Sequence, residues 1–131
     1  MGLLSICLSV HNRHELLERA IWSWLRQEDR HFEVVMVDDA SDPPIEPWIV
    51  ERALDYGLDL RVIRSDVPHG SHTWGYNECL AAARGSVLLF THPEILIPPS
   101  IVALAKARAK PSVTAPACPV APPPFTLTHT S

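Results

Sequence analysis

The sequence predicts an α/β fold in which a small parallel β-sheet is sandwiched by helices. Two apolar runs, residues 3–9 and 32–37, are each followed directly by polar residues. Uninterrupted apolar runs are typical of strands that are buried on both faces of a parallel sheet. Helical patterns separate these runs from each other and from two shorter apolar runs. Right-handed β-α-β connections would wind such an order into one parallel sheet.

The first expected strand, residues 3–9, leads into a helix. Asn12 and Glu15 have the spacing of a capping box, in which the Asn side chain accepts a hydrogen bond from a free backbone N–H at the helix start. The apolar residues that follow recur at helical spacing and would form one face of this helix. They are Leu16, Leu17, Ala20, Ile21, Trp24 and Leu25. The second expected strand covers residues 32–37.

Prolines mark the region after the second strand. Pro43, Pro44 and Pro47 predict a loop there. A helix over about residues 48–56 should follow and end at Gly57, because glycine readily adopts the left-handed conformation that closes many helices.

The remaining elements continue the alternation. We expect a third strand over residues 60–64, a helix over about residues 73–84 that Gly85 ends, and a fourth strand over residues 87–90. A short helix over about residues 98–109 completes the series.

The chain divides into one domain and a proline-rich tail. Residues 1–109 have an ordinary globular composition, and the whole chain of 131 residues is large enough for a real core. Residues 110–131 hold six of the thirteen prolines. Because proline is excluded from helix interiors and central strands, we expect this segment to be an extended or disordered tail.

Composition excludes several classes of partner. A net charge of −4 and the lack of a basic stripe argue against nucleic acid. No apolar run approaches the ~20 residues of a membrane-spanning helix. Three distant cysteines, Cys7, Cys79 and Cys118, predict reduced thiols and a cytoplasmic protein. The unpaired edges of a short sheet leave room for a homo-oligomer.

Polar motifs follow the two main strands. The first strand ends in Ser9-Val10-His11-Asn12-Arg13 and the second in Val37-Asp38-Asp39-Ala40-Ser41. In open parallel sheets, ligands bind beyond the carboxyl ends of the strands, so both motifs should belong to one site. A dinucleotide-binding Rossmann site is excluded, because residues 9–14 contain no glycine. A receiver domain would carry its acid pair after the first strand, whereas here the pair follows the second.

These motifs resemble the opening of family 2 glycosyltransferases, which are nucleotide-sugar enzymes with the GT-A fold. Their typical start is a strand, a "TYNR"-like turn, a helix and a strand that ends in "VDDGS". Further matches are Phe32-Glu33 before the second strand and Asn77, with Ala83-Arg84-Gly85-Ser86, before the fourth. The resemblance spans roughly residues 3–104 and implies the strand order 3-2-1-4. It covers the nucleotide-binding half of the family's domain.

The resemblance places a nucleotide diphosphate sugar, with UDP-sugars favoured, at the two strand ends. Asp39 would accept a hydrogen bond from the imide N–H of a pyrimidine, and the ring of His11 would cover the base. Ser9 and Val10 would act through backbone groups, and Arg13 could approach a phosphate. Asp38 and Asn77 complete the expected nucleotide site. Alternatively, the two aspartates are solvated turn acids and His11 is an ordinary loop residue.

Family members hold Mn²⁺ or Mg²⁺ with an Asp-x-Asp-like triplet after the fourth strand, since these ions prefer oxygen ligands. Here residues 89–95 contain no Asp, so Glu94 is the only carboxylate and His92 the only other candidate ligand. The alternative is a plain turn with a surface acid. His69, His72 and His92 could instead form a zinc site, but chance clustering is the simpler interpretation.

The resemblance assigns no catalytic residue. Inverting sugar transfer needs a general base, which the family supplies from its acceptor-binding half. Residues 95–131 contain no Asp or Glu that could take this role. Two hypotheses therefore stand: a domain that binds a nucleotide sugar for transfer to an unknown acceptor, or a truncated or degenerate domain that binds a nucleotide or a partner without catalysis.

Overall fold

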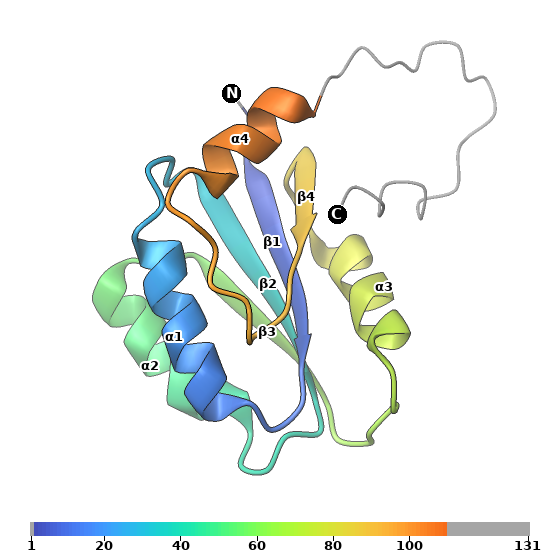
Figure 1. The fold of residues 1–131 in the computed structure, drawn as a ribbon. Coiled ribbons are helices and arrows are strands. Elements are labelled where there is room, and N and C mark those ends of the chain that lie inside the picture. The colour runs from blue at the N-terminus through green and yellow to red at the C-terminus, as the bar shows by residue number, and fades with distance from the viewer. Residues whose placement is uncertain (1, 110–131) are drawn as a thin grey trace, which may run out of the picture.

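The computed structural model describes residues 2–109, which form a single four-stranded sheet with four helices (Figure 1). The elements are β1 Leu4–Val10, α1 His14–Leu25, β2 Phe32–Asp39, α2 Ile45–Tyr56, β3 Leu60–Ser65, α3 His72–Ala82, β4 Val87–Phe90 and α4 Ile101–Arg108. All strand pairs are parallel, and their order is β3-β2-β1-β4. The predicted fold class and strand order are confirmed. The predicted tail, residues 110–131, lies outside the described residues.

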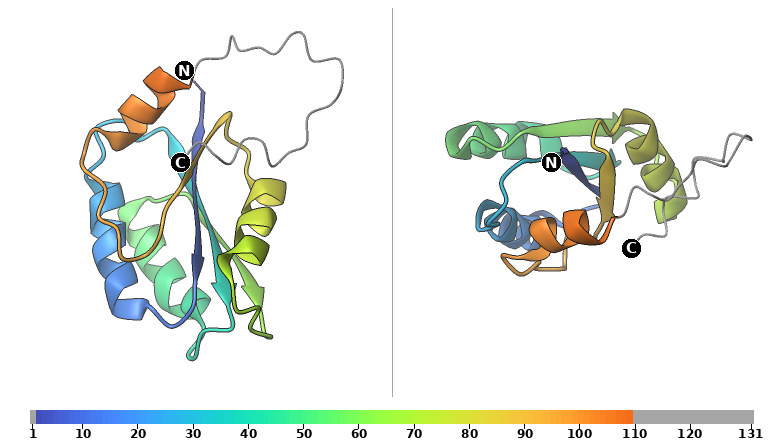
Figure 2. Two further views of the ribbon diagram at one scale, coloured as in Figure 1. Left: turned by 45° about the vertical axis from the view of Figure 1, so that its right-hand side comes forward. Right: turned by 90° about the horizontal axis from the view of Figure 1, so that it is seen from above.

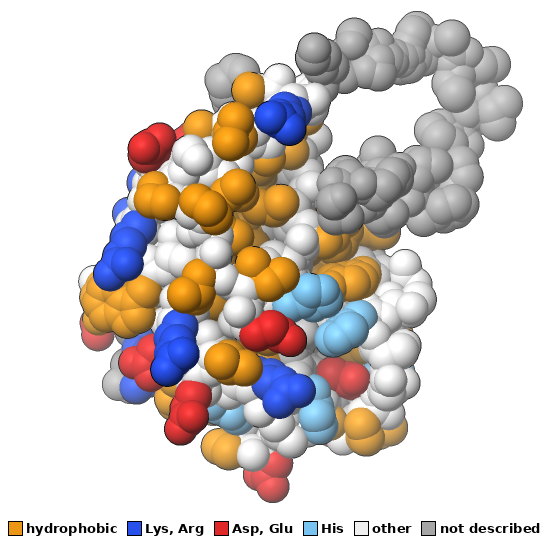
Figure 3. Space-filling view, viewed as in Figure 1, with side chains coloured by type: hydrophobic (Ala, Val, Ile, Leu, Met, Phe, Trp, Pro, Cys, Tyr) orange, Lys and Arg blue, Asp and Glu red, His pale blue; other side chains and the backbone are white. Residues whose placement is uncertain are grey.

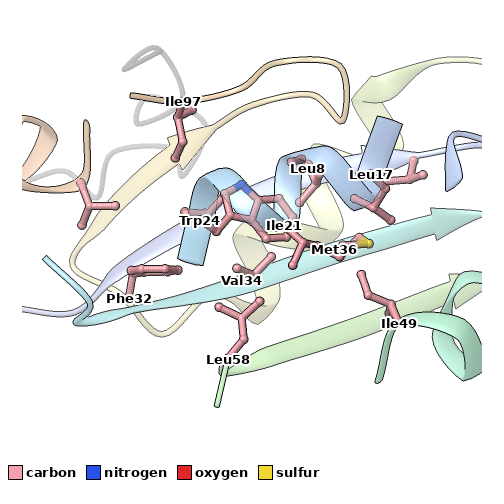
Figure 4. Packing of buried hydrophobic residues seen from close by; sticks show 14 of the residues in the cluster. Leu8, Leu17, Ile21, Trp24, Phe32, Val34, Met36, Ile49, Leu58 and Ile97 are labelled. Atoms are coloured by element: carbon pink, nitrogen blue, oxygen red, sulfur yellow. The ribbon is translucent and has the colours of Figure 1, made fainter. Parts of the chain in front are cut away.

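The helices cover the two faces of the sheet unequally. Helices α1, α2 and α4 lie on one face and α3 on the other (Figure 2). Successive side chains of a strand point to opposite faces, so Leu4, Ile6 and Leu8 of β1 join the larger core, whereas Cys7 joins the smaller one under α3. Trp24 of α1 is fully buried in the larger core (Figure 4). Both central strands are buried along their whole length, as the apolar runs predicted.

A buried carboxylate ties the amino-terminal side of the sheet together. Glu33 is fully buried and accepts hydrogen bonds from Ser5 Oγ at 2.6 Å and from Arg61 Nη2 at 3.0 Å. Arg84 also donates to Glu33, from its backbone N–H at 2.7 Å and from its Nε at 3.0 Å. Burial alone would raise the pKa of Glu33, but these hydrogen bonds outweigh it and lower the pKa to about 2. Glu33 is therefore an ionised link between β1, β2, β3 and the segment between α3 and β4.

The predicted capping box at the start of α1 is wrong. Arg13 occupies the N-cap position, and no side chain caps the helix. Asn12 has a positive φ of 55°, and its Oδ1 accepts a hydrogen bond from the backbone N–H of Asp42 at 2.7 Å. Its own N–H donates to Ser41 Oγ at 2.9 Å. Asn12 thus links the turn after β1 to the turn after β2.

Two helix boundaries differ from the prediction because carboxylates outside the helices, those of Asp38 and Glu33, hold the backbone. Helix α2 begins at Ile45, whose N–H donates to Asp38 Oδ2 at 2.9 Å, and Pro47 lies in the first turn, where its missing N–H is not needed. Helix α3 ends at Ala82, since Arg84 leaves the helix to bond Glu33. Gly85 does not end the helix; a Cβ there would lie 2.7 Å from the carbonyl oxygen of Leu3.

Helix α4 begins at Ile101, three residues later than predicted. Across residues 2–109, no helix combines the length and the apolar character that crossing a membrane requires.

Candidate functional site

A cavity of about 260 Å³ lies beyond the carboxyl ends of β1 and β2. Val10 of β1 pairs in register with Asp38 of β2, so the two strands end at the same level. The cavity walls come from these two strand ends and from the segment that joins β3 to α3. The lining residues are Ser9, Val10, His11, Asp39, Pro68, Gly70, Ser71 and His72. Four of the residues predicted to bind a nucleotide therefore converge.

Asp39 is the acidic group of this cavity, and only 7% of it is exposed. Its carboxylate accepts two hydrogen bonds from the backbone N–H of His69, at 3.1 Å to each oxygen, and one from His69 Nδ1 at 2.9 Å. Burial would raise the pKa of Asp39, but the hydrogen bonds from His69 outweigh it and hold the pKa below its usual range. Asp39 is therefore ionised at neutral pH and can only accept hydrogen bonds.

His11 is fixed beside Asp39 by a backbone contact. Its Nδ1 lies 2.6 Å from the carbonyl oxygen of Asp39, so Nδ1 carries the hydrogen and donates it. The Nδ2 of Asn12 lies 3.2 Å from the other ring nitrogen. The imidazole is exposed yet held at both nitrogens, which presents a ring of defined orientation at the edge of the cavity.

Asp38 has a different environment from its neighbour. It is fully buried, and its carboxylate accepts hydrogen bonds from the N–H of Ser41 at 3.0 Å, the N–H of Ile45 at 2.9 Å and Arg64 Nη1 at 2.7 Å. Burial would raise the pKa of Asp38, but these bonds lower it. Asp38 does not line the cavity. It fixes the turn that carries Asp39 and the first turn of α2.

Ser9 lies where α3 approaches β1 closely. A Cβ on Gly75 would lie 2.6 Å from the Cβ of Ser9, so glycine permits this approach. Arg13 and Asn77 are both exposed, and neither lines the cavity. Arg13 is the N-cap residue of α1 and Asn77 lies within α3.

Histidine side chains gather on the face shown in the space-filling view, together with acidic groups (Figure 3). The ring of His92 lies 5.2 Å from that of His72 and 3.3 Å, through Nδ1, from the hydroxyl oxygen of Tyr76. His69 instead bonds Asp39, so the three histidines of the zinc alternative do not converge. Glu94 is exposed in the turn after β4.

No group of three His, Cys, Asp or Glu side chains in residues 2–109 is arranged to hold a metal ion. Glu94 and His92 thus do not make a metal site from protein ligands alone. One carboxylate fits an ion that takes most of its ligands from phosphate oxygens and water, which is a common arrangement for Mg²⁺.

A comparison with protein families identifies the family of this chain. The sequence model described as "Glycosyl transferase family 2" matches residues 5–111. The chain belongs to this family. The match covers both polar motifs, the segment from β3 to α3 and the turn after β4, and the chain has the strand order expected of the nucleotide-binding part of a GT-A domain.

Individual relatives are longer than this chain. The "Uncharacterized protein MT1568" of Mycobacterium tuberculosis (strain CDC 1551 / Oshkosh) is 33% identical over 112 residues, which are 85% of this chain and 34% of that protein. TarS 1-349 of S. aureus in complex with UDP-GlcNAc has a TM-score of 0.71 and 27% identity, covering 82% of this chain and 30% of that one. The mannosyltransferase PcManGT from Pyrobaculum calidifontis, in complex with GDP-Man and Mn²⁺, has a TM-score of 0.68 and 26% identity, covering 86% and 34%. The chain spans about a third of the length of these relatives.

Sequence reasoning missed the contribution of the segment from β3 to α3. Pro68, Gly70, Ser71 and His72 line the cavity, and His69 binds Asp39. A signal was present, because β3 neighbours β2 in the predicted order and the segment after a parallel strand reaches the ligand edge of the sheet. The contact of His69 with Asp39 joins residues 30 positions apart and has no local pattern.

Proposed function

We propose that this chain provides the nucleotide-binding part of a glycosyltransferase that uses a nucleoside diphosphate sugar, with UDP-sugars favoured. One observation carries the proposal: an ionised, nearly buried carboxylate and a fixed imidazole border the same cavity at the ends of β1 and β2. Family membership supports it, as does the similarity to TarS, whose structure holds UDP-GlcNAc.

In this proposal Asp39 accepts the imide N–H of the base, and the ring of His11 covers one face of the base. Ser9 and Val10 offer backbone groups to the nucleoside. Asp38 acts indirectly, because it holds the turn after Asp39 in place. Arg13 is exposed and free to approach a phosphate.

Asn77 is exposed on α3 outside the cavity lining. Its role toward the nucleotide sugar therefore remains a prediction from the motif alone.

Glu94 and His92 would hold a Mn²⁺ or Mg²⁺ ion together with oxygens of the diphosphate. Such an ion would neutralise the charge of the departing nucleoside diphosphate. Glu94 is exposed and can turn toward the ion, and the ring of His92 is positioned by Tyr76. The acceptor and the general base are unassigned, and the cytoplasmic location and homo-oligomer remain predictions.

A second candidate is nucleotide binding without sugar transfer. It is favoured by the turn after β4, where Glu94 is the only carboxylate and His92 already contacts Tyr76. The two candidates share the base site and differ at the diphosphate.

Thermal unfolding with UDP, UDP-sugars and UMP, each with and without Mn²⁺, tests the proposal. A nucleotide at 100 times its dissociation constant should stabilise the protein by ~2.7 kcal/mol. Mn²⁺ should tighten UDP binding and leave UMP less affected, and Glu94→Gln should remove this effect of the ion. Glu18→Gln, at an exposed position of α1, is the matched control.

No stabilisation by any nucleotide would refute the proposed function. UDP binding that is the same with and without Mn²⁺, in both wild type and Glu94→Gln, would favour the second candidate.

A further inference from the structure

The carboxylate of Asp39 is already partly used within the protein. Within residues 2–109 it receives hydrogen bonds from two donors, both of His69: the backbone N–H is shared between the two oxygens and Nδ1 bonds Oδ1. A carboxylate offers about four acceptor positions in total. Two are occupied on Oδ1 and one on Oδ2, so a single position on Oδ2 is left for a ligand.

The His69 ring, which donates a hydrogen bond to Asp39, is itself held in place. The His69 ring stacks on the indole of Trp74, in the first turn of α3, with centroids 3.8 Å apart and an interplanar angle of 4°. Because a carboxylate only accepts, His69 Nδ1 must carry a hydrogen in this arrangement. The side chain of His69 is 31% exposed and that of Asp39 9%, so the pair lies near the surface. Asp39 lines the cavity, as do Pro68 and Gly70 on either side of His69.

We propose that His69 is a specificity-determining residue that restricts Asp39 to bases with a single imide donor and thereby selects uridine over guanosine diphosphate sugars. The inference rests on the proposed function. Uracil offers one N–H on its pairing edge, which one acceptor position satisfies. Guanine presents an imide N–H and an amino group side by side, and a carboxylate receives both only when each oxygen has a free position. With Oδ1 occupied by His69, the amino group would be left unpaired, which costs affinity.

The choice between uracil and guanine matters because the solved relatives include complexes with both kinds of nucleotide sugar. One TarS structure holds UDP-GlcNAc and the PcManGT structure holds GDP-Man. Fold similarity therefore does not indicate which base binds. The occupation of Asp39 Oδ1 by His69 does indicate it.

Calorimetric titration of UDP and of GDP, both with Mn²⁺, tests this in four proteins: wild type, His69→Ala, His69→Asn and His31→Ala. His69→Ala removes the ring donor and leaves one acceptor position free on Oδ1, where only the backbone N–H of residue 69 remains. The preference for UDP should therefore fall by about tenfold, the value of one hydrogen bond to a charged group. His69→Asn places an amide donor near the position of Nδ1 and should restore most of the preference. His31→Ala makes the same change at an exposed position before β2 and should match the wild type.

Trp74→Leu removes the stacking partner but keeps His69, and it should lower the preference for UDP by a smaller factor. This variant decides the question if His69→Ala does not fold. An unchanged ratio of the two dissociation constants in His69→Ala, or a wild type that prefers GDP, would overturn the role of His69 while nucleotide binding stands. A wild type that binds neither nucleotide would refute the proposed function itself, and the inference with it.

Discussion

At the amino-terminal end of β2, the Glu33 carboxylate accepts four hydrogen bonds from Ser5, Arg61 and Arg84, and it is fully buried. At the other end, the Asp39 carboxylate borders a cavity of about 260 Å³, and within residues 2–109 only His69 bonds it. Both groups are ionised, because hydrogen bonds lower both pKa values despite burial. The difference lies in what remains available: Glu33 is saturated and stabilises the fold, whereas Asp39 keeps one acceptor position for a ligand.

Asp38, adjacent to Asp39, behaves like Glu33. Its oxygens are taken by Ser41, Ile45 and Arg64, and it is fully buried. Neighbouring side chains of a strand point to opposite faces. The side chain of Asp38 is therefore buried, whereas that of Asp39 lines the cavity. A single strand thus carries two structural acids and one acid suited to recognition.

The largest effect on stability is expected at Glu33. Glu33→Gln keeps the size of the side chain but removes the charge that Arg61 and Arg84 neutralise. Breaking a buried charge pair costs ~3–5 kcal/mol, and the partly exposed arginines place the expected loss near the lower end, at about 3 kcal/mol in urea unfolding. Nucleotide affinity of the folded protein should not change. Glu18→Gln is again the control on an exposed surface.

The pH dependence of unfolding sharpens this prediction. The pKa of Glu33 is lowered from 4.5 to about 2 on folding. The stabilisation is therefore fully present above pH 4.5 and is lost as the pH falls from 4.5 toward 2, and the shift corresponds to about 3 kcal/mol. In Glu33→Gln this part of the acid destabilisation should be missing. Equal slopes of stability against pH in the two proteins would contradict the structural role of Glu33.

A smaller loss of stability is expected from Asp38→Asn. The amide retains one acceptor oxygen but turns its N–H₂ either toward the N–H of Ser41 or toward the shared position of the Ile45 N–H and Arg64. The protein should therefore lose ~1–2 kcal/mol of stability. Chemical unfolding measures this loss, and calorimetry with UDP should find a weaker effect on affinity than any change at Asp39. If Asp38→Asn abolished binding without loss of stability, the division between the two aspartates would be wrong.

The sequence predicted what depends on local pattern. The apolar runs of β1 and β2 identified the central strands, and the polar residues after them located Ser9, Val10, His11 and Asp39 at one edge. Side-chain contacts with the backbone of another element were not predictable in this way. Asp38 moves the start of α2 to Ile45, seven residues later, and Glu33 bonds Arg84, 51 residues later, which lies beyond the end of α3.

Asn12 shows the same limit for a local motif. It has the spacing of a capping residue, yet its side chain bonds Asp42 in the facing turn, 30 residues away. His69 is the case that matters for function, because only the fold brings it to Asp39.

Calorimetric titration of UDP into wild type, Asp39→Asn and Asp38→Asn tests the central claim most directly. In Asp39→Asn the single amide oxygen is engaged by His69, and the amide N–H₂ then faces the N–H of the base, donor against donor. Affinity for UDP should fall by ~1–3 kcal/mol, the cost of an unpaired buried group. Asp38→Asn should lower the free energy of unfolding and reduce the affinity for UDP less than Asp39→Asn does. Unchanged affinity for UDP in a folded Asp39→Asn protein would contradict the assignment of Asp39 as the residue that receives the base.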